Sequence, residues 1–145
     1  MNDNQNDLLQ KAIAELKNSP TVDIKGKSYT QVSTRINIFR KYLPTASIAT
    51  LITYNDDIRV IIQTKISLND RVIATGYAEE VRGDGNYINQ TSAVENCETS
   101  SIGRALSNLG LGGSEYASSF EVTSAIAKQE QIKQTAHQQS HQKQY

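Results

Sequence analysis

The cationic side chains of this chain are the residues best suited to binding chemistry. Arg104 is the only cation between Thr91 and Gly110, and the segment from Ile24 to Asn55 has no acidic residue. That segment carries Lys25, Lys27, Arg35, Arg40 and Lys41. Lysine and arginine neutralise phosphates, and a local positive field persists in a chain of zero net charge because salt screens distant charges. These residues indicate a site for a phosphate-bearing polymer; the alternative is a solvated basic face.

Catalysis and metal binding have weak support in the sequence. Both histidines, His137 and His141, fall in the polar C-terminal segment, and no cysteine–histidine cluster has metal-ligand spacing. Cys97 lies on the apolar side of a predicted helix, which is typical of a core residue. Glu79, Glu80 and Asp84 have no histidine and no second acidic cluster near them in the sequence that would indicate a metal or acid–base site. We therefore predict a protein that is not an enzyme and that uses no cofactor or metal.

Two helices and a short strand precede the centre of the chain. A helix is expected over Asp7–Asn18 and a strand over Val22–Lys25. Ser28 and Gln31 have the spacing of a capping box, and apolar residues behind them recur every three or four positions. This pattern predicts an amphipathic helix over about Tyr29–Tyr42. The cations assigned to its polar face are Arg35, Arg40 and Lys41.

Three strands and a second long helix follow. The strands are expected over Ala46–Tyr54, Ile58–Leu68 and Arg71–Val81, as an antiparallel meander with one buried face. Alternation in the middle strand leaves Arg59 and Lys65 on the polar face. Gly76, in the third strand, indicates a bulge or a close approach of a helix. A second capping box, Ser92 with Glu95, opens a helix that Gly110 ends.

These elements predict an α+β fold, an antiparallel three- to four-stranded β-meander with helices packed on one face, in the order β-α-β-β-β-α. Residues 1–21 form an N-terminal helix and linker, and residues 22–113 form the core. Residues 114–128 are expected to form a C-terminal helix, and residues 129–145 a disordered glutamine-rich tail. The apolar runs fall far short of the roughly 20 residues that span a bilayer. We therefore expect an intracellular protein without a membrane partner.

Five segments carry a resemblance to a known family. They are Gly26–Tyr29, Arg35–Phe39, Ala74–Glu80, Thr91–Asn96 and Ser101–Leu106. In this order of elements, they resemble the phage single-strand annealing proteins and their eukaryotic relative, the Rad-fifty-two recombination mediator. The last segments are similar to the Ala-Glu-Thr-x-Ala-Ile-Gly-Arg-Ala-Leu stretch of the essential-recombination-function type. The resemblance covers roughly residues 22–113.

The resemblance implies a function and an assembly. Its members bind single-stranded DNA without sequence preference and anneal complementary strands without ATP, here in phage recombination in the bacterial cytoplasm. They form homo-oligomeric rings or helical filaments, and the DNA lies in a groove between the meander and the helix. The candidate DNA contacts are Lys27, Arg35, Arg40, Lys41, Arg59, Lys65 and Arg104. Arg104 matches an arginine that contacts phosphate in the family, but Ser107 stands where the eukaryotic relative has a further arginine.

Other roles remain open at this point. Arg104 also suits the negative end of its own helix. The chain has no Trp and only two Phe, which favours holding phosphates over stacking bases. The alternatives are a passive single-stranded DNA-binding protein and a protein-interaction or assembly module. The C-terminal tail is a candidate spacer, a regulator of filament growth or a docking site for host or phage replication proteins, or a solvated end without a role.

Overall fold

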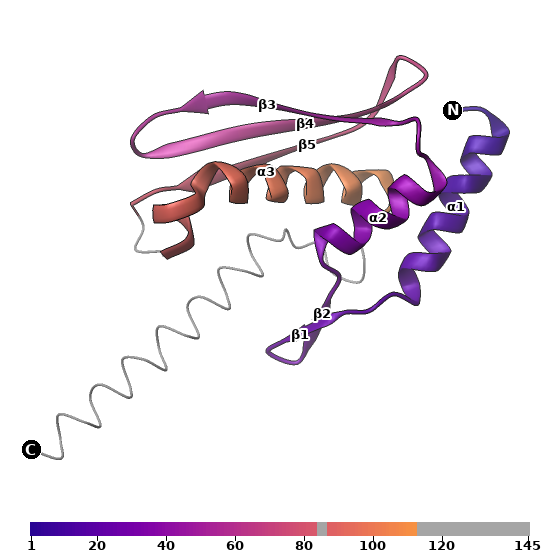
Figure 1. Ribbon diagram of the computed structural model, residues 1–145, viewed down its shortest axis with the longest axis horizontal. Coiled ribbons are helices and arrows are strands. Elements are labelled where there is room, and N and C mark those ends of the chain that lie inside the picture. Colours follow the sequence, from indigo (N-terminus) through magenta and orange to yellow (C-terminus); the bar gives the residue numbers. More distant parts are fainter. Residues whose placement is uncertain (84–86, 113–145) are drawn as a thin grey trace, which may run out of the picture.

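The computed structural model describes residues 1–83 and 87–112, and for residues 87–91 it describes the backbone alone (Figure 1). The α+β fold predicted from the sequence is confirmed. The elements in chain order are α1 (Asp3–Lys17), β1 (Val22–Ile24), β2 (Lys27–Tyr29), α2 (Val32–Tyr42), β3 (Ser47–Asn55), β4 (Arg59–Leu68), β5 (Arg71–Val81) and α3 (Tyr87–Leu109). Figure 1 shows α3 along one face of the sheet, with α1 and α2 beside its C-terminal half.

The main sheet is an antiparallel meander in the order β3-β4-β5. Side chains alternate along β4, so that Val60, Ile62 and Ile66 are buried toward α3 while Arg59 and Lys65 point the other way. This confirms the predicted alternation. The face toward α3 forms the core, and the opposite face has no helix on it among the described residues.

Helix α3 lies unusually close to β5, and Gly76 makes this possible. A methyl group added at Gly76 would lie 2.4 Å from the backbone nitrogen of Ala105 and 2.8 Å from the Cβ of Arg104. The interpretation of Gly76 as a point of close helix approach is therefore confirmed. A second close contact occurs at Gly103, whose added Cβ would lie 2.9 Å from Val32 of α2. Two glycines thus seat α3 against the sheet and against α2.

The core consists of two clusters joined by α3. The larger one lies where α1, α2 and the sheet meet, and includes Phe39, Ile66 and Leu106. The smaller one contains Val60, Ile62, Ala93 and Cys97. The prediction that Cys97 is a core residue is confirmed.

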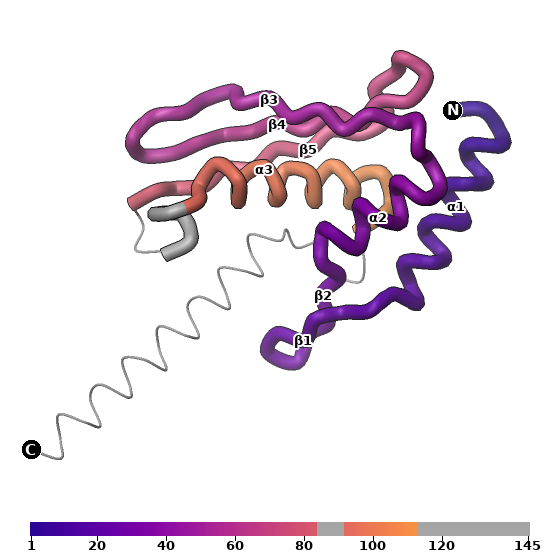
Figure 2. Tube along the Cα trace, in the orientation of Figure 1, coloured from indigo at the N-terminus to yellow at the C-terminus, as the bar shows by residue number. Residues whose placement is uncertain are grey.

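The predicted start of α2 is wrong. Lys27–Tyr29 pairs with Val22–Ile24 in a two-stranded hairpin, and α2 begins only at Val32. The turn residues Lys25 and Gly26 both have positive φ, 53° and 79°, a conformation that suits a two-residue hairpin turn. Gln31 is the N-cap of α2 and makes no side-chain capping bond, so Ser28 does not act in a capping box. Figure 2 shows this hairpin projecting beside α2.

Other boundaries shift by less. Helix α1 begins four residues earlier than expected, because Asn2 and Gln5 form a capping box. Helix α3 begins at Tyr87, but Ser92 has non-helical φ and ψ of −146° and 43° and divides it, at the position where the sequence predicted a helix start. The segments predicted as a C-terminal helix, 114–128, and as a disordered tail, 129–145, lie outside the described residues. Across residues 1–83 and 87–112, no helix is both long and apolar enough to cross a bilayer.

Candidate nucleic-acid interface

The seven cations predicted as DNA contacts do not line one groove, and Arg35 is the clearest departure. Only 1% of Arg35 is exposed, so its assignment to the polar face of its helix is wrong. Its Nε donates to the carbonyl oxygen of Leu111 at 2.5 Å, and its Nη2 donates to the carbonyl oxygen of Gly103 at 2.5 Å and to Ser107 Oγ at 2.8 Å. Arg35 thus ties α2 to the end of α3. Burial lowers the pKa of its guanidinium to about 10.

Arg40 and Lys41 are exposed but hold the fold together locally. Arg40 Nη1 donates to the carbonyl oxygen of Ala46, and its guanidinium lies 5.6 Å from the centre of the Phe39 ring. Lys41 Nζ lies 2.5 Å from Glu15 Oε1 and so joins α2 to α1. The hydrogen bond and charge of Glu15 raise the pKa of Lys41. Both cations stabilise the junction of helices and sheet, away from the exposed sheet face.

Arg104 and Lys27 lie apart from each other. Arg104 is half-buried on α3, and its Cβ approaches Gly76 of β5. Lys27 is exposed on the β1–β2 hairpin. The groove predicted between the meander and the helix is closed along β5, because the helix backbone touches the strand at Gly76 and Ala105.

Arg59 and Lys65 lie near opposite ends of β4 on the side of the sheet away from α3, which we call the open face. Its residues are Ser47, Ala49, Leu51, Tyr54, Arg59, Ile61, Gln63, Lys65, Ser67, Val72, Thr75, Tyr77, Glu79 and Val81. The register places Lys65 between Ala49 and Thr75, and the next row holds Leu51, Gln63 and Tyr77. Small neighbours leave Lys65 accessible, and among the described residues it makes no ion pair. Arg59 forms an exposed pair with Glu79 at 3.4 Å.

Two tyrosines on the open face were missed by sequence reasoning. Tyr77 is 56% exposed and Tyr54 is 49% exposed, so both rings are available to a ligand. Aromatic faces on a sheet are the surfaces on which unpaired bases stack. The signal for them was the same alternation that placed Lys65, because Tyr77 pairs with Gln63 and Tyr54 with Ile61.

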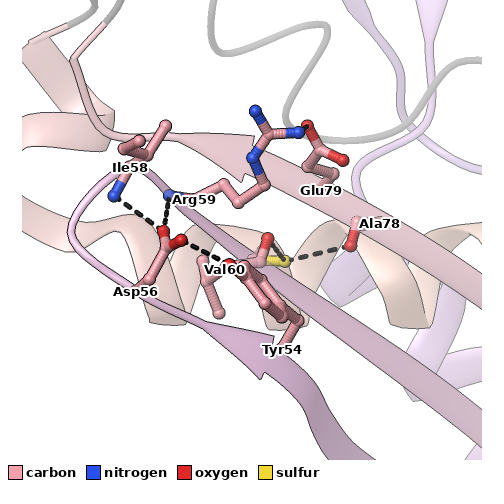
Figure 3. A network of polar contacts seen from close by, with 8 residues as sticks. Tyr54, Asp56, Ile58, Arg59, Val60, Ala78 and Glu79 are labelled. Atoms are coloured by element: carbon pink, nitrogen blue, oxygen red, sulfur yellow. Dashed lines mark hydrogen bonds and ion pairs between the residues drawn. The ribbon is translucent and has the colours of Figure 1, made fainter.

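The carboxylate of Asp56 fixes the end of the open face, as Figure 3 shows. Asp56 accepts hydrogen bonds from the hydroxyl of Tyr54 at 2.6 Å and from the backbone nitrogens of Ile58 and Arg59, both at 2.8 Å. These bonds lower the pKa of Asp56, and the bond to Asp56 raises the pKa of Tyr54. On the buried side of the sheet, Cys97 Sγ lies 3.5 Å from the carbonyl oxygen of Val60, and burial raises the pKa of its thiol to about 11.

Arg82 completes the same corner of the sheet. Its Nε donates to the carbonyl oxygen of Asp56 at 3.1 Å, and its Nη2 donates to Asn55 Oδ1 at 2.7 Å. The guanidinium therefore braces the β3–β4 turn. Within the described residues, no three metal-ligating side chains gather into a cluster.

A family model described as Slr1353 N-terminal dsRNA-binding domain-like matches residues 36–109, about half of the chain. The chain belongs to this family. The match runs from within α2 through β3, β4, β5 and α3, so it includes the open face and Arg104 but leaves out Lys27 and Arg35. No curated protein and no solved structure matches the chain.

Proposed function

We propose that this protein binds nucleic acid, and that the open face of its sheet is the contact surface. One observation carries the proposal: the uncovered face of the meander places the accessible ammonium of Lys65 one row from the exposed ring of Tyr77. The description of the family, a dsRNA-binding-like domain, supports nucleic acid as the ligand class.

The chemistry of this face fits a single strand. Lys65 provides a point charge for a backbone phosphate, and displacement of condensed counterions drives that contact. Tyr77 and Tyr54 provide flat rings on which any base can stack, because every base has a π-face. Neither group distinguishes one base from another. Binding without sequence preference follows from this combination.

The finer proposal is strand annealing, as the resemblance to the phage annealing proteins implies. Two exposed tyrosines hold few bases, so most bases of a bound strand stay available for pairing. One protomer offers few accessible cations on this face, and a long strand therefore requires several copies, in a ring, a filament or a smaller homo-oligomer. The proposed activity needs no ATP and no catalytic residue, and it acts in recombination.

The second candidate is binding of double-stranded RNA, which the description of the family favours. Proteins recognise RNA duplexes through phosphates and 2′-hydroxyls across the shallow minor groove rather than by stacking. This candidate would depend on cations such as Lys65 and not on Tyr54 and Tyr77. Dependence on the tyrosines therefore separates the two functions.

The proposal is tested by fluorescence anisotropy with labelled oligonucleotides of equal length, as single-stranded DNA, double-stranded DNA and double-stranded RNA. We expect the single strand to bind most tightly, and its affinity to fall as salt rises. Faster pairing of two complementary labelled strands would support annealing, and unchanged pairing would indicate a passive binder. Preference for the RNA duplex would favour the second candidate. Binding to none of them at low salt would overturn nucleic-acid binding and favour an assembly module.

A further inference from the structure

The main sheet has a long unprotected edge at β3. Its register pairs β3 with β4 on one side only, and no other strand of the described residues lies beside it. In Figure 1, β3 forms the outer margin of the sheet. The register is regular from Ser47 to Ile52 and shifts before Tyr54. Six regular residues span about 20 Å of free backbone donors and acceptors.

The composition of β3 lacks the features that usually protect an edge. Soluble proteins protect edge strands with charged residues, proline or short length. The nine residues of β3 include no charge and no proline. Instead, Leu51 is 60% exposed on the open face and Ile52 is 48% exposed on the other face. Exposed apolar side chains next to unpaired backbone indicate that a further strand pairs with β3 in the working protein.

The second edge of the sheet is less available. Asn108 Nδ2 of α3 donates to the carbonyl oxygen of Thr75 at 2.7 Å, so a side chain already uses part of the β5 backbone. Strand β5 also carries the charges of Arg71 and Glu79. A partner strand therefore meets fewer obstacles at β3 than at β5.

We propose that β3 pairs antiparallel with β3 of a second copy of this chain. We place the two-fold axis beside Leu51, within the regular stretch of the strand. Residues at or next to the axis lie opposite or diagonal to their own counterparts, so a charge there would meet its like. A strand with no charge avoids this repulsion. The apolar residues Leu51 and Ile52 would then gain apolar neighbours from the partner strand. Self-pairing is the arrangement that this uncharged edge fits.

The geometry of the pair follows from its symmetry. Antiparallel pairing of identical strands requires a two-fold axis perpendicular to the sheet, which keeps the same face of both copies on the same side. The result is a continuous six-stranded sheet with both α3 helices on one side and both open faces on the other. The pairing does not depend on the proposed function. If the pairing and the proposed function both hold, one nucleic-acid strand can contact Lys65 of both copies.

The pairing is tested by light scattering coupled to size exclusion, over a range of concentrations and without nucleic acid. We expect the parent to be a dimer, and Leu51→Lys and Leu51→Glu each to be monomeric, because each brings like charges together across the axis. Mixing the two variants should restore a dimer, because Lys then faces Glu. Val72→Lys is the control, because Val72 is exposed and lies on β5, away from the β3 edge; this variant should remain dimeric. A monomeric parent, or a parent assembly that survives both Leu51 variants, overturns the pairing.

A cross-linking experiment covers the case in which the charged variants fold poorly. Cys97 is buried, so a cysteine introduced at Leu51 is the reactive thiol among the described residues. We expect Leu51→Cys to form a disulfide-linked dimer on mild oxidation, at least tenfold faster than Val72→Cys at the same protein concentration. Equal rates for the two variants would overturn the pairing. A dimer that ignores oligonucleotides would contradict the proposed function alone, and a monomer that binds them would contradict the pairing alone.

Discussion

Arg35 of α2 donates a hydrogen bond of 2.5 Å to the carbonyl oxygen of Gly103 in α3, and the same guanidinium reaches the carbonyl oxygen of Leu111. A cation that the sequence placed on a binding surface thus joins two helices inside the protein. Its three acceptors lie near the C-terminal end of α3, where the helix dipole favours positive charge.

Substitution of Arg35 should therefore affect folding and leave binding intact. We expect Arg35→Met to lower the free energy of unfolding by about 3 kcal/mol, because buried carbonyls lose a charged donor. Arg35→Lys should also be destabilised, since an ammonium cannot reproduce the planar fork. Urea denaturation measures the change. If Arg35→Met instead keeps the stability of the parent and binds oligonucleotides more weakly, Arg35 contacts the nucleic acid and the prediction is wrong.

The close approach at Gly76 predicts a second loss of stability. In Gly76→Ala the new methyl group meets the backbone of Ala105, which cannot move aside as a flexible side chain would. We expect a loss of about 1–3 kcal/mol, typical of overpacking. Gly83→Ala is the control, because nothing lies within 4 Å of a Cβ there. Similar melting temperatures for the two variants would mean that α3 does not press on β5.

The salt dependence of binding tests the role of Lys65. We expect Lys65→Gln to make the slope of log affinity against log salt shallower by roughly 0.7, the value for one phosphate contact on a single strand. Lys17→Gln is the matched control, because Lys17 is an exposed lysine in the last turn of α1, away from the open face. Equal slopes for the two variants would remove Lys65 from the site.

Base stacking predicts a different response at Tyr77. We expect Tyr77→Ala to weaken binding to single-stranded DNA by about 1–3 kcal/mol, the range for one stacked base, and to leave the salt slope unchanged. Tyr77→Phe keeps the ring and should bind as the parent does. A loss in Tyr77→Phe as large as in Tyr77→Ala would point to the hydroxyl rather than to stacking.

The thiol of Cys97 should be unreactive in the folded protein, because its pKa is raised to about 11 and the thiolate is the nucleophile. We expect a maleimide to label it at pH 8 only when denaturant is added. The raised pKa also implies a stability term that is complete below pH 9 and is lost as pH rises toward 11. Unfolding free energies across that interval should fall more steeply in the parent than in Cys97→Ala.

The sequence predicted the meander and the long helices because their periods are clear. Residues at every second position of β4 are buried, and Val32 and Phe39 lie on one face of α2. The β1–β2 hairpin was missed because Ser28 and Gln31 imitate a helix start, whereas the deciding feature was the Lys25–Gly26 turn.

The candidate site was harder to predict than the fold. Arg35 follows Val32 by three positions and precedes Phe39 by four, so its position already lay on the buried face of α2. Its charge concealed this, because arginine is rarely buried unless acceptors converge on it. Those acceptors lie about 70 residues further along the chain and become neighbours only on folding.

Helix α3 covers one face of the sheet, and it is the last of the described elements to be synthesised. A ribosome releases β3, β4 and β5 before residues 93–109, so Val60 and Ile62 lack the cover of Ala93 and Cys97 while the strands are already complete. During that interval the nascent sheet is apolar on one side and has a bare β3 edge. The nascent sheet therefore stays open to association with other chains until Ala105 reaches Gly76.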